Sequence, residues 1–344
     1  MDAEHPFLLA CRRQPAPHTP VWLMRQAGRY LPEYRAVRER FSFLELCKTS
    51  EAACEVTVQP IDRFGMDAAI LFADILLVLE PLQLGLAFRA GDGPALDNPI
   101  RSPEDVSRLP QVDVADSLSY VFETVRQVRA ALAGRVPLIG FAGAPFTLAA
   151  YAIEGGGSRN YLATKRFMLD HPEAWNDLMA RLVDVTVDYL THQVEAGAQA
   201  LQIFDSWVGH LGPDDYRTAV LPHMKNLFAR LPDSVPVIHF GTGASGIIES
   251  MTEAGGDVVG LDWRISLAEG WRRIGHDRAV QGNLDPTLLF ASFDVIRSKV
   301  RNLLEQAGGR PGHIANLGHG ILPGTPVDGV RCFVDAVHEF GKPS

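Results

Sequence analysis

The chain contains 344 residues, of which 47% are hydrophobic and 21% are charged, and its formal charge is −9. A chain of this length and composition can bury a large core, which excludes disordered and fibrous proteins. The excess of acidic residues also argues against sequence-independent binding to nucleic acid, because a polyphosphate backbone requires a basic face.

The N-terminal residues predict no targeting peptide. Residues 1–14 carry acids early and have only a short apolar stretch at 7–11, whereas a signal peptide has a cationic start and a long hydrophobic segment. The four cysteines form no C-x-x-C pair, so we expect neither a disulfide framework nor a zinc ribbon. These features favour a protein of the cytoplasm, whose thiols stay reduced.

Short apolar runs recur along the whole chain, and segments with helical periodicity separate most of them. The clearest helix begins near Pro172, carries apolar side chains at three- or four-residue steps and ends at Gly197. Continuous hydrophobicity in the runs indicates strands of a parallel sheet that is buried on both faces. We therefore predict a single α/β domain over residues 1–344, built as a (β/α)8 TIM-type barrel with strands near 21–24, 68–73, 138–141, 200–204, 235–240, 258–261, 279–282 and 314–317.

Residues 136–153 form an uncharged stretch of eighteen residues, just long enough to be taken for a membrane span. Proline and glycine at four positions interrupt this stretch, so we interpret it as a buried strand, a turn and the first turns of a helix. We expect no membrane contact. The segment 91–110, which is rich in glycine and proline, is expected to be an excursion on the surface.

Many of the apolar runs end in a polar or charged residue. In an α/β barrel the carboxyl ends of the strands form the active-site face, so these residues are expected to lie together at that end of the barrel. The alternative, that a polar residue merely terminates its strand, stays open for each of them. The residues concerned are Arg25, Asp74, Asp205, Ser206, Asp262, Asn283 and His319.

Residues 25–40 hold five arginines within an acidic protein. The planar guanidinium group binds carboxylates in two-point fashion, so the cluster predicts a ligand with several carboxylates or phosphates. The alternative is a solvated basic helix face that pairs with Glu33 and Glu39.

Asp74 places a carboxylate between two apolar runs, at 69–73 and 75–79. Burial of an unpaired carboxylate is costly, so Asp74 must accept several hydrogen bonds or face a ligand that donates them. A helix amino terminus could supply the donors instead.

Residues 241–246 read GTGASG and match the dinucleotide-binding pattern G-x-G-x-x-G, with Asp262 at the end of the next run where a ribose-binding acid would fall. This motif follows four earlier strands, whereas the fingerprint normally belongs to the first strand, which favours a glycine-rich barrel loop. The histidines occur mostly as singletons and no H-E-x-x-H pair is present, so we expect no metal site.

Residues 22–35, which read WLMRQAGRYLPEYR, resemble the amino-terminal signature of the uroporphyrinogen decarboxylase family. A second block, GFAGAPFTL at 140–148 with Tyr151 and EGGGS at 154–158, is similar to the family's other diagnostic segment. Further matches are FADIL at 72–76, FDSW at 204–207 and NLGHG at 316–320. Long signatures in the right order are more specific than a six-residue glycine pattern.

The resemblance implies a cofactor-free lyase, with an α/β barrel and a homodimeric state, that converts the four acetate side chains of uroporphyrinogen to methyl groups. It implies that Asp74 stabilises the cationic, ring-protonated substrate through the pyrrole N–H groups. It places Asp74, Tyr151, Arg25 and His319 in catalysis, with Arg25 and His319 both open as the proton donor. The substrate-binding set that it implies comprises Arg25, Gln26, Ala27, Gly28, Arg29, Arg38, Asp74, Tyr151, Ser206 and His319.

Three other functions stay open from the sequence. A corrinoid or thiol methyltransferase of the same superfamily would need a zinc-binding cysteine two residues after His239, where this chain has Gly241. An NAD-dependent oxidoreductase would use the loop at 241–246. The non-enzyme alternative is a tetrapyrrole-binding or degenerate scaffold protein of the same fold, and the presence of Asp74 and Tyr151 argues against it.

Overall fold

The computed structural model describes residues 5–89 and 93–342. Its centre is a seven-stranded parallel sheet in the order β1-β4-β5-β6-β7-β8-β9, and each strand pairs with the next one of the set along the chain. Seven of the eight predicted runs form these strands. Their bounds are β1 Ala69–Ile70, β4 Leu138–Gly143, β5 Ala200–Asp205, β6 Val237–Gly241, β7 Val258–Gly260, β8 Ala279–Leu284 and β9 His313–Leu317.

The eighth run, at 21–24, closes the barrel between β9 and β1. Val21 forms a parallel bridge with Ala315 of β9, and its carbonyl accepts a 2.8 Å hydrogen bond from the Asp67 amide just before β1. The run does not continue as a regular strand, because the next backbone amides donate to side-chain oxygens instead of to the backbone of a neighbouring strand. Asn316 accepts from the Met24 amide at 3.3 Å and Gln26 accepts from the Leu23 amide at 3.1 Å. The predicted α/β barrel is therefore confirmed, with one strand reduced to a bridge.

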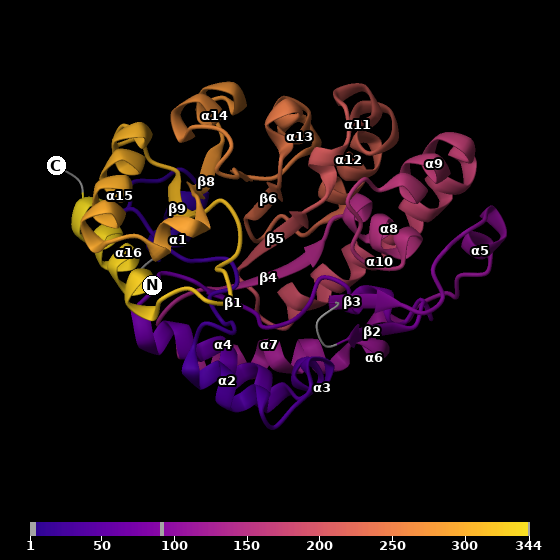
Figure 1. Ribbon diagram of the computed structural model, residues 1–344, viewed down its shortest axis with the longest axis horizontal. Coiled ribbons are helices and arrows are strands. Elements are labelled where there is room, and N and C mark those ends of the chain that lie inside the picture. Colours follow the sequence, from indigo (N-terminus) through magenta and orange to yellow (C-terminus); the bar gives the residue numbers. More distant parts are fainter. Residues whose placement is uncertain (1–4, 90–92, 343–344) are drawn as a thin grey trace.

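Helices cover the outside of the strands in Figure 1. The predicted helix at 172–197 is confirmed as α10, and the indole of Trp175 on its buried face donates to the Ala219 carbonyl. The α-helices are α1 Pro6–Cys11, α2 Pro32–Arg38, α3 Phe43–Lys48, α4 Ser50–Phe64, α5 Pro103–Ser107, α6 Val114–Ser117, α7 Ser119–Leu132, α8 Pro145–Glu154, α9 Leu162–Asp170, α10 Pro172–Glu195, α11 Pro213–Ala219, α12 Leu221–Arg230, α13 Ile248–Ala254, α14 Leu267–Ile274, α15 Phe293–Ala307 and α16 Val327–Phe340.

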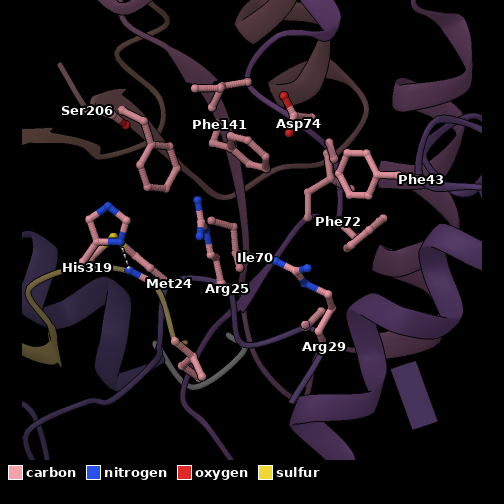
Figure 2. Close-up of a pocket in the computed structure, with 18 of the residues that line it drawn as sticks. Met24, Arg25, Arg29, Phe43, Ile70, Phe72, Asp74, Phe141, Ser206 and His319 are labelled. Carbon is pink, nitrogen blue, oxygen red and sulfur yellow. Dashed lines mark hydrogen bonds between the residues drawn. The ribbon is translucent and has the colours of Figure 1, made fainter. Parts of the chain in front are cut away.

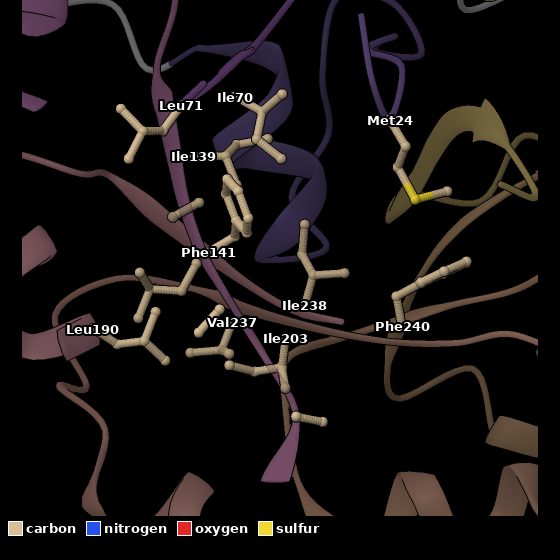
Figure 3. Close-up of a cluster of buried hydrophobic side chains, with 14 of the residues drawn as sticks. Met24, Ile70, Leu71, Ile139, Phe141, Leu190, Ile203, Val237, Ile238 and Phe240 are labelled. Atoms are coloured by element: carbon tan, nitrogen blue, oxygen red, sulfur yellow. The ribbon is translucent and has the colours of Figure 1, made fainter. Parts of the chain in front are cut away.

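The core lies between the strands and these helices. Aliphatic and aromatic side chains from β1, β4, β5 and β6 form one cluster with Leu190 of α10, as Figure 3 shows. A chain of buried side-chain hydrogen bonds crosses the core: the Trp22 indole donates to Gln281, and Gln281 donates to Gln202. Burial on both faces explains why the strands read as continuous apolar runs.

The uncharged stretch at 136–153 forms β4, a turn and α8, as predicted. Among the described residues no helix is both long and apolar enough to cross a membrane. In the segment 91–110, residues 91 and 92 lie outside the described part. The rest is tied to the barrel, because β3 (Gly93–Leu96) pairs with β2 (Leu86–Arg89), and Ala95 bridges to Gly156 after α8.

Candidate active site

A cavity of about 380 Å³ opens at the carboxyl ends of the strands. Figure 2 shows charged side chains and aromatic rings that point into it from opposite sides. The walls are mainly apolar, and polar groups come from segments far apart in the chain. The lining residues are Met24, Arg25, Ala27, Gly28, Arg29, Tyr30, Tyr34, Phe43, Ile70, Leu71, Phe72, Ala73, Asp74, Ile75, Leu76, Pro94, Phe141, Tyr151, Phe204, Ser206, Phe240, His319, Gly320, Ile321, Leu322 and Pro323.

Eight of the ten sequence-predicted site residues line this cavity. They are Arg25, Ala27, Gly28, Arg29, Asp74, Tyr151, Ser206 and His319. They come from the N-terminal segment before α2, the turn after β1, helix α8, and the ends of β5 and β9. The first half of the chain thus contributes most of the charged groups, and the second half contributes Ser206 and His319.

Gln26 and Arg38 do not line the cavity. Gln26 is fully buried, and its amide accepts from the Leu23 amide and donates to the Ala68 carbonyl, so it fixes the closing strand. Arg38 donates to the Phe41 carbonyl, and its guanidinium carbon lies 5.8 Å from the ring centroid of Phe43, which lines the cavity. The sequence could not separate these two from Arg25 and Arg29. Gln26 lies in an irregular segment, where side-chain direction has no periodicity, and Arg38 ends helix α2, whose position relative to the cavity depends on tertiary packing.

Arg25 reaches the cavity from a strained backbone. Its φ is 60°, a left-handed conformation that non-glycine residues rarely adopt and that costs on the order of 1 kcal/mol. The turn is held by the Gln26 amide, which donates to the Leu23 carbonyl. The Arg25 side chain is exposed and lies beside Gly320.

Arg29 is the second exposed guanidinium of the site, and in Figure 2 it lies to the right of Arg25. Its backbone is held in place, since Arg35 donates to the Arg29 carbonyl at 3.0 Å. The Tyr30 hydroxyl donates to the Gln26 carbonyl at 2.8 Å. Two guanidinium groups therefore flank a mainly apolar space, an arrangement suited to a ligand with separated carboxylates.

Asp74 lies in the turn after β1 and lines the cavity. One carboxylate oxygen accepts from the Leu76 amide at 2.9 Å, and the structure gives the other oxygen no hydrogen bond from a described residue. Burial raises the pKa of Asp74, whereas the Leu76 amide and the charge of Arg25 act in the opposite direction. Asp74 is thus an acceptor with unused capacity in an apolar cavity.

Tyr151 of α8 brings a hydroxyl group to the same cavity. Burial, reinforced by the charge of Asp74, raises the pKa of Tyr151 to about 12, so the phenol stays protonated and able to donate. Its ring packs against Trp207, 5.7 Å between centroids. Ser206 lies in the turn between β5 and this tryptophan.

The turn that carries Ser206 is fixed by a buried carboxylate that sequence reasoning did not place in this role. Asp205 at the end of β5 accepts a 2.8 Å hydrogen bond from the Thr147 hydroxyl, and that hydroxyl accepts from the Trp207 amide at 3.2 Å. Burial raises the pKa of Asp205 to about 7, and the Thr147 hydrogen bond opposes this shift only in part. The FDSW motif signalled the segment but not which of its polar side chains faces the cavity.

His319 follows β9 and lines the cavity opposite Asp74 in Figure 2. Burial lowers the pKa of His319 to about 4, and the nearby charges of Arg25 and Arg264 add to this effect. The Gly320 amide donates to Nδ1 at 2.8 Å, so the neutral ring carries its proton on Nε2. At neutral pH His319 is therefore an uncharged hydrogen-bond donor.

The glycine-rich loop at 241–246 has a packing role. A Cβ at Gly241 would lie 2.9 Å from Met251 Sδ and 3.0 Å from Ala244 Cβ. The Gly243 amide donates to Asp262 at 2.5 Å, and Asp262 also accepts from Arg264 at 2.6 Å. The acid that the pattern would assign to a ribose is buried and binds the loop itself, which disfavours the NAD-dependent alternative.

The methyltransferase alternative is also disfavoured by the glycine at 241. The position where that chemistry would need a thiolate has no room for a side chain unless Met251 moves. His239, two residues before, is buried against Phe228, and burial lowers the pKa of its ring to about 4.

Comparison with known proteins agrees with the geometry. A family model described as uroporphyrinogen decarboxylase matches residues 2–340. Proteins named uroporphyrinogen decarboxylase from Carboxydothermus hydrogenoformans and Chloroflexus aurantiacus are 55% and 56% identical, and each match covers 98% of this chain and 96% of the relative.

Among solved structures, a methyltransferase from Methanosarcina mazei aligns with a TM-score of 0.81 over 97% of this chain and 98% of its own. Its sequence identity is 19%, so this likeness concerns the fold. A full-length family match together with relatives above 50% identity decides the assignment: the chain belongs to the uroporphyrinogen decarboxylase family.

Proposed function

We propose that the chain is a carboxy-lyase that removes CO2 from the four acetate side chains of uroporphyrinogen III and yields coproporphyrinogen III. The observation that carries this proposal is the placement of Asp74, a carboxylate with a free oxygen, in an apolar cavity flanked by Arg25 and Arg29. An octacarboxylate macrocycle needs cations at its rim and an acceptor for the pyrrole N–H groups at its centre. Family membership and the names of the relatives support the same reaction.

The chemistry requires an electron sink. Direct loss of CO2 from a pyrrole acetate would leave a carbanion without delocalisation, so the ring carbon is protonated first and the cationic ring then accepts the electron pair of the breaking C–C bond. Protonation of the exocyclic carbon completes the methyl group, and loss of the added proton from the ring carbon restores the pyrrole. Asp74 stabilises the cation by charge and by N–H hydrogen bonds that tighten as positive charge develops.

The other groups of the cavity orient the substrate. Arg25 and Arg29 bind peripheral carboxylates, and Tyr151 and Ser206 donate hydrogen bonds. Arg25 and His319 are the two candidates for the proton donor. A ring with a pKa of about 4 is neutral at neutral pH, so His319 lacks the extra proton that a general acid would transfer. We therefore assign His319 to carboxylate binding through its Nε2–H, which leaves Arg25 as the candidate proton donor.

Turnover of the proposed substrate is the direct test. The protein is incubated anaerobically with uroporphyrinogen III, and the products are oxidised and separated by chromatography. We expect porphyrins with seven, six, five and finally four carboxylates. If the octacarboxylate stays unchanged but binds, as seen by fluorescence quenching, the chain is a tetrapyrrole-binding scaffold and not an enzyme. Reduction of NAD by 2-hydroxy acids would favour the oxidoreductase instead.

The resemblance also supports a homodimer in the cytoplasm, formed by single-domain chains of residues 1–344. Light scattering coupled to size exclusion should then give twice the chain mass of 37.7 kDa. A mass equal to one chain at micromolar concentration would contradict the dimer without affecting the proposed reaction.

A further inference from the structure

Three side chains far apart in the sequence converge on one point near the start of β1. His18 Nε2 lies 2.8 Å from one carboxylate oxygen of Asp67, and His338 Nε2 lies 2.8 Å from the other. The two imidazole rings are 5.1 Å apart between centroids and nearly perpendicular. One ligand atom from each residue can be chosen so that all three lie within 4.8 Å of one another.

This cluster lies away from the cavity. Asp67 precedes β1, His18 precedes the closing strand, and His338 is in the last turn of α16. In an α/β barrel the helices run opposite to the strands, so the end of α16 and the starts of the strands share the amino-terminal face. The active-site cavity occupies the other face, and none of the three residues lines it.

The carboxylate is held in a fixed orientation. The Val21 amide donates to Asp67 Oδ2 at 2.8 Å, and the Asp67 amide donates to the Val21 carbonyl at 2.8 Å. The side chains of His18, Asp67 and His338 are 25%, 11% and 31% exposed, so water and small ions can reach them. A backbone donor to a ligating carboxylate is the kind of support that orients metal ligands.

We propose that His18, Asp67 and His338 form a binding site for a divalent transition-metal ion such as Zn²⁺. Two imidazole nitrogens and a carboxylate are a common ligand set for this ion, with metal–ligand distances of about 2.0–2.2 Å. Such an ion replaces the protons now shared between each ring and the carboxylate, and the rings move apart from the oxygens by a fraction of an ångström to admit it. Water completes the coordination from the exposed side.

The site joins three separate segments. An ion bound there would connect the segment just before the closing strand, the start of β1 and the end of α16. These segments meet where Val21 closes the barrel. Binding to the folded chain alone shifts the unfolding equilibrium toward the native state, so the ion should raise the melting temperature. The proposed decarboxylation does not depend on it, because the two sites occupy opposite ends of the barrel.

Calorimetric titration of the chelator-treated full-length protein with ZnCl2 tests the site. We expect one Zn²⁺ per chain and a higher melting temperature in its presence. His338→Gln and His18→Gln should each weaken binding at least tenfold and abolish the thermal shift. The matched control is His192→Gln, because His192 also contacts two carboxylates, Asp188 and Glu195, but through different ring nitrogens that cannot converge on one ion.

Two further measurements separate a metal site from a hydrogen-bonded clamp. Co²⁺ in place of Zn²⁺ should give visible absorption bands that are lost in His18→Gln. Circular dichroism and uroporphyrinogen turnover of this variant should match the parent protein. Absence of stoichiometric binding, or equal loss of binding in His192→Gln, would overturn the proposal and leave a clamp made only of hydrogen bonds.

Discussion

Gly320 provides the space through which the side chain of Arg25 reaches the cavity. A Cβ built at position 320 would approach the Cγ, Cδ and Nε atoms of Arg25 to 3.0 Å or less. Gly320 is fixed in turn by its amide, which donates to His319. The NLGHG segment after β9 and the N-terminal segment therefore depend on each other, although almost the whole chain separates them.

Gly320→Ala should displace the Arg25 guanidinium without unfolding the protein. Because a displacement of about 1 Å can cost up to 100-fold in rate, we expect kcat/KM for uroporphyrinogen to fall about 10- to 100-fold, mainly through KM. Gly246→Ala is the control, since a Cβ there meets no atom within 4 Å. Steady-state kinetics of both variants would decide, and equal activity of the two would show that the Arg25 position is not limiting.

Asp74→Asn should retain the fold and lose turnover. The amide keeps the shape of the side chain but removes the charge that faces the cationic ring, and loss of one such stabilising group typically costs about 100- to 1,000-fold in kcat. Asp116→Asn, at the exposed start of α6, should leave kcat unchanged. Near-normal turnover in Asp74→Asn would remove the proposed role of the carboxylate.

His319 should show no titration near neutral pH. Its pKa of about 4 predicts that the NMR shifts of the ring stay constant from pH 8 to 6 and move only below pH 5. His319→Gln, which keeps a donor, should retain more activity than His319→Ala. A ring that titrates near pH 6.5 would restore His319 as a proton donor.

The ends of the strands illustrate how far the sequence could predict the site. Every predicted run occupies its place in the barrel, because buried parallel strands leave a strong hydrophobic pattern. The pattern does not tell which way the side chains at a strand end point, however, and Asp205, the last residue of β5, and Ser206, the first of the turn, have different roles. Ser206 lines the cavity, whereas Asp205 is buried behind it. Similarly, Asn283 ends its run but donates to the carbonyls of Asp262 and Ile265.

Contacts between distant segments were beyond sequence reasoning. Arg29 lines the cavity and Arg38 does not, and only the position of helix α2 relative to the cavity distinguishes the two. Likewise, His18 and His338 looked like isolated histidines because their partner, Asp67, is 49 and 271 residues away.

Asp205 should make stability depend on pH. Its pKa rises from 3.8 in the unfolded chain to about 7 in the fold, so the folded state binds more protons between these values. The free energy of unfolding should therefore decrease as pH rises from 4 to 7, by at most about 1.4 kcal/mol per pH unit. Urea denaturation of Asp205→Asn, compared with the parent at each pH, should show that the difference between them varies over this range. A constant difference would contradict the raised pKa.

Gln26→Leu should destabilise the closing strand rather than alter substrate binding. The substitution leaves the Leu23 amide and the Ala68 carbonyl buried without partners, and each unsatisfied group costs about 1–3 kcal/mol. We expect a loss of about 2–4 kcal/mol in urea denaturation and an unchanged KM in the folded protein. Gln127→Leu on α7, whose side-chain amide donates to Glu123 at the surface, should change stability by less than about 0.5 kcal/mol. A large increase in KM with normal stability would instead return Gln26 to the substrate-binding set.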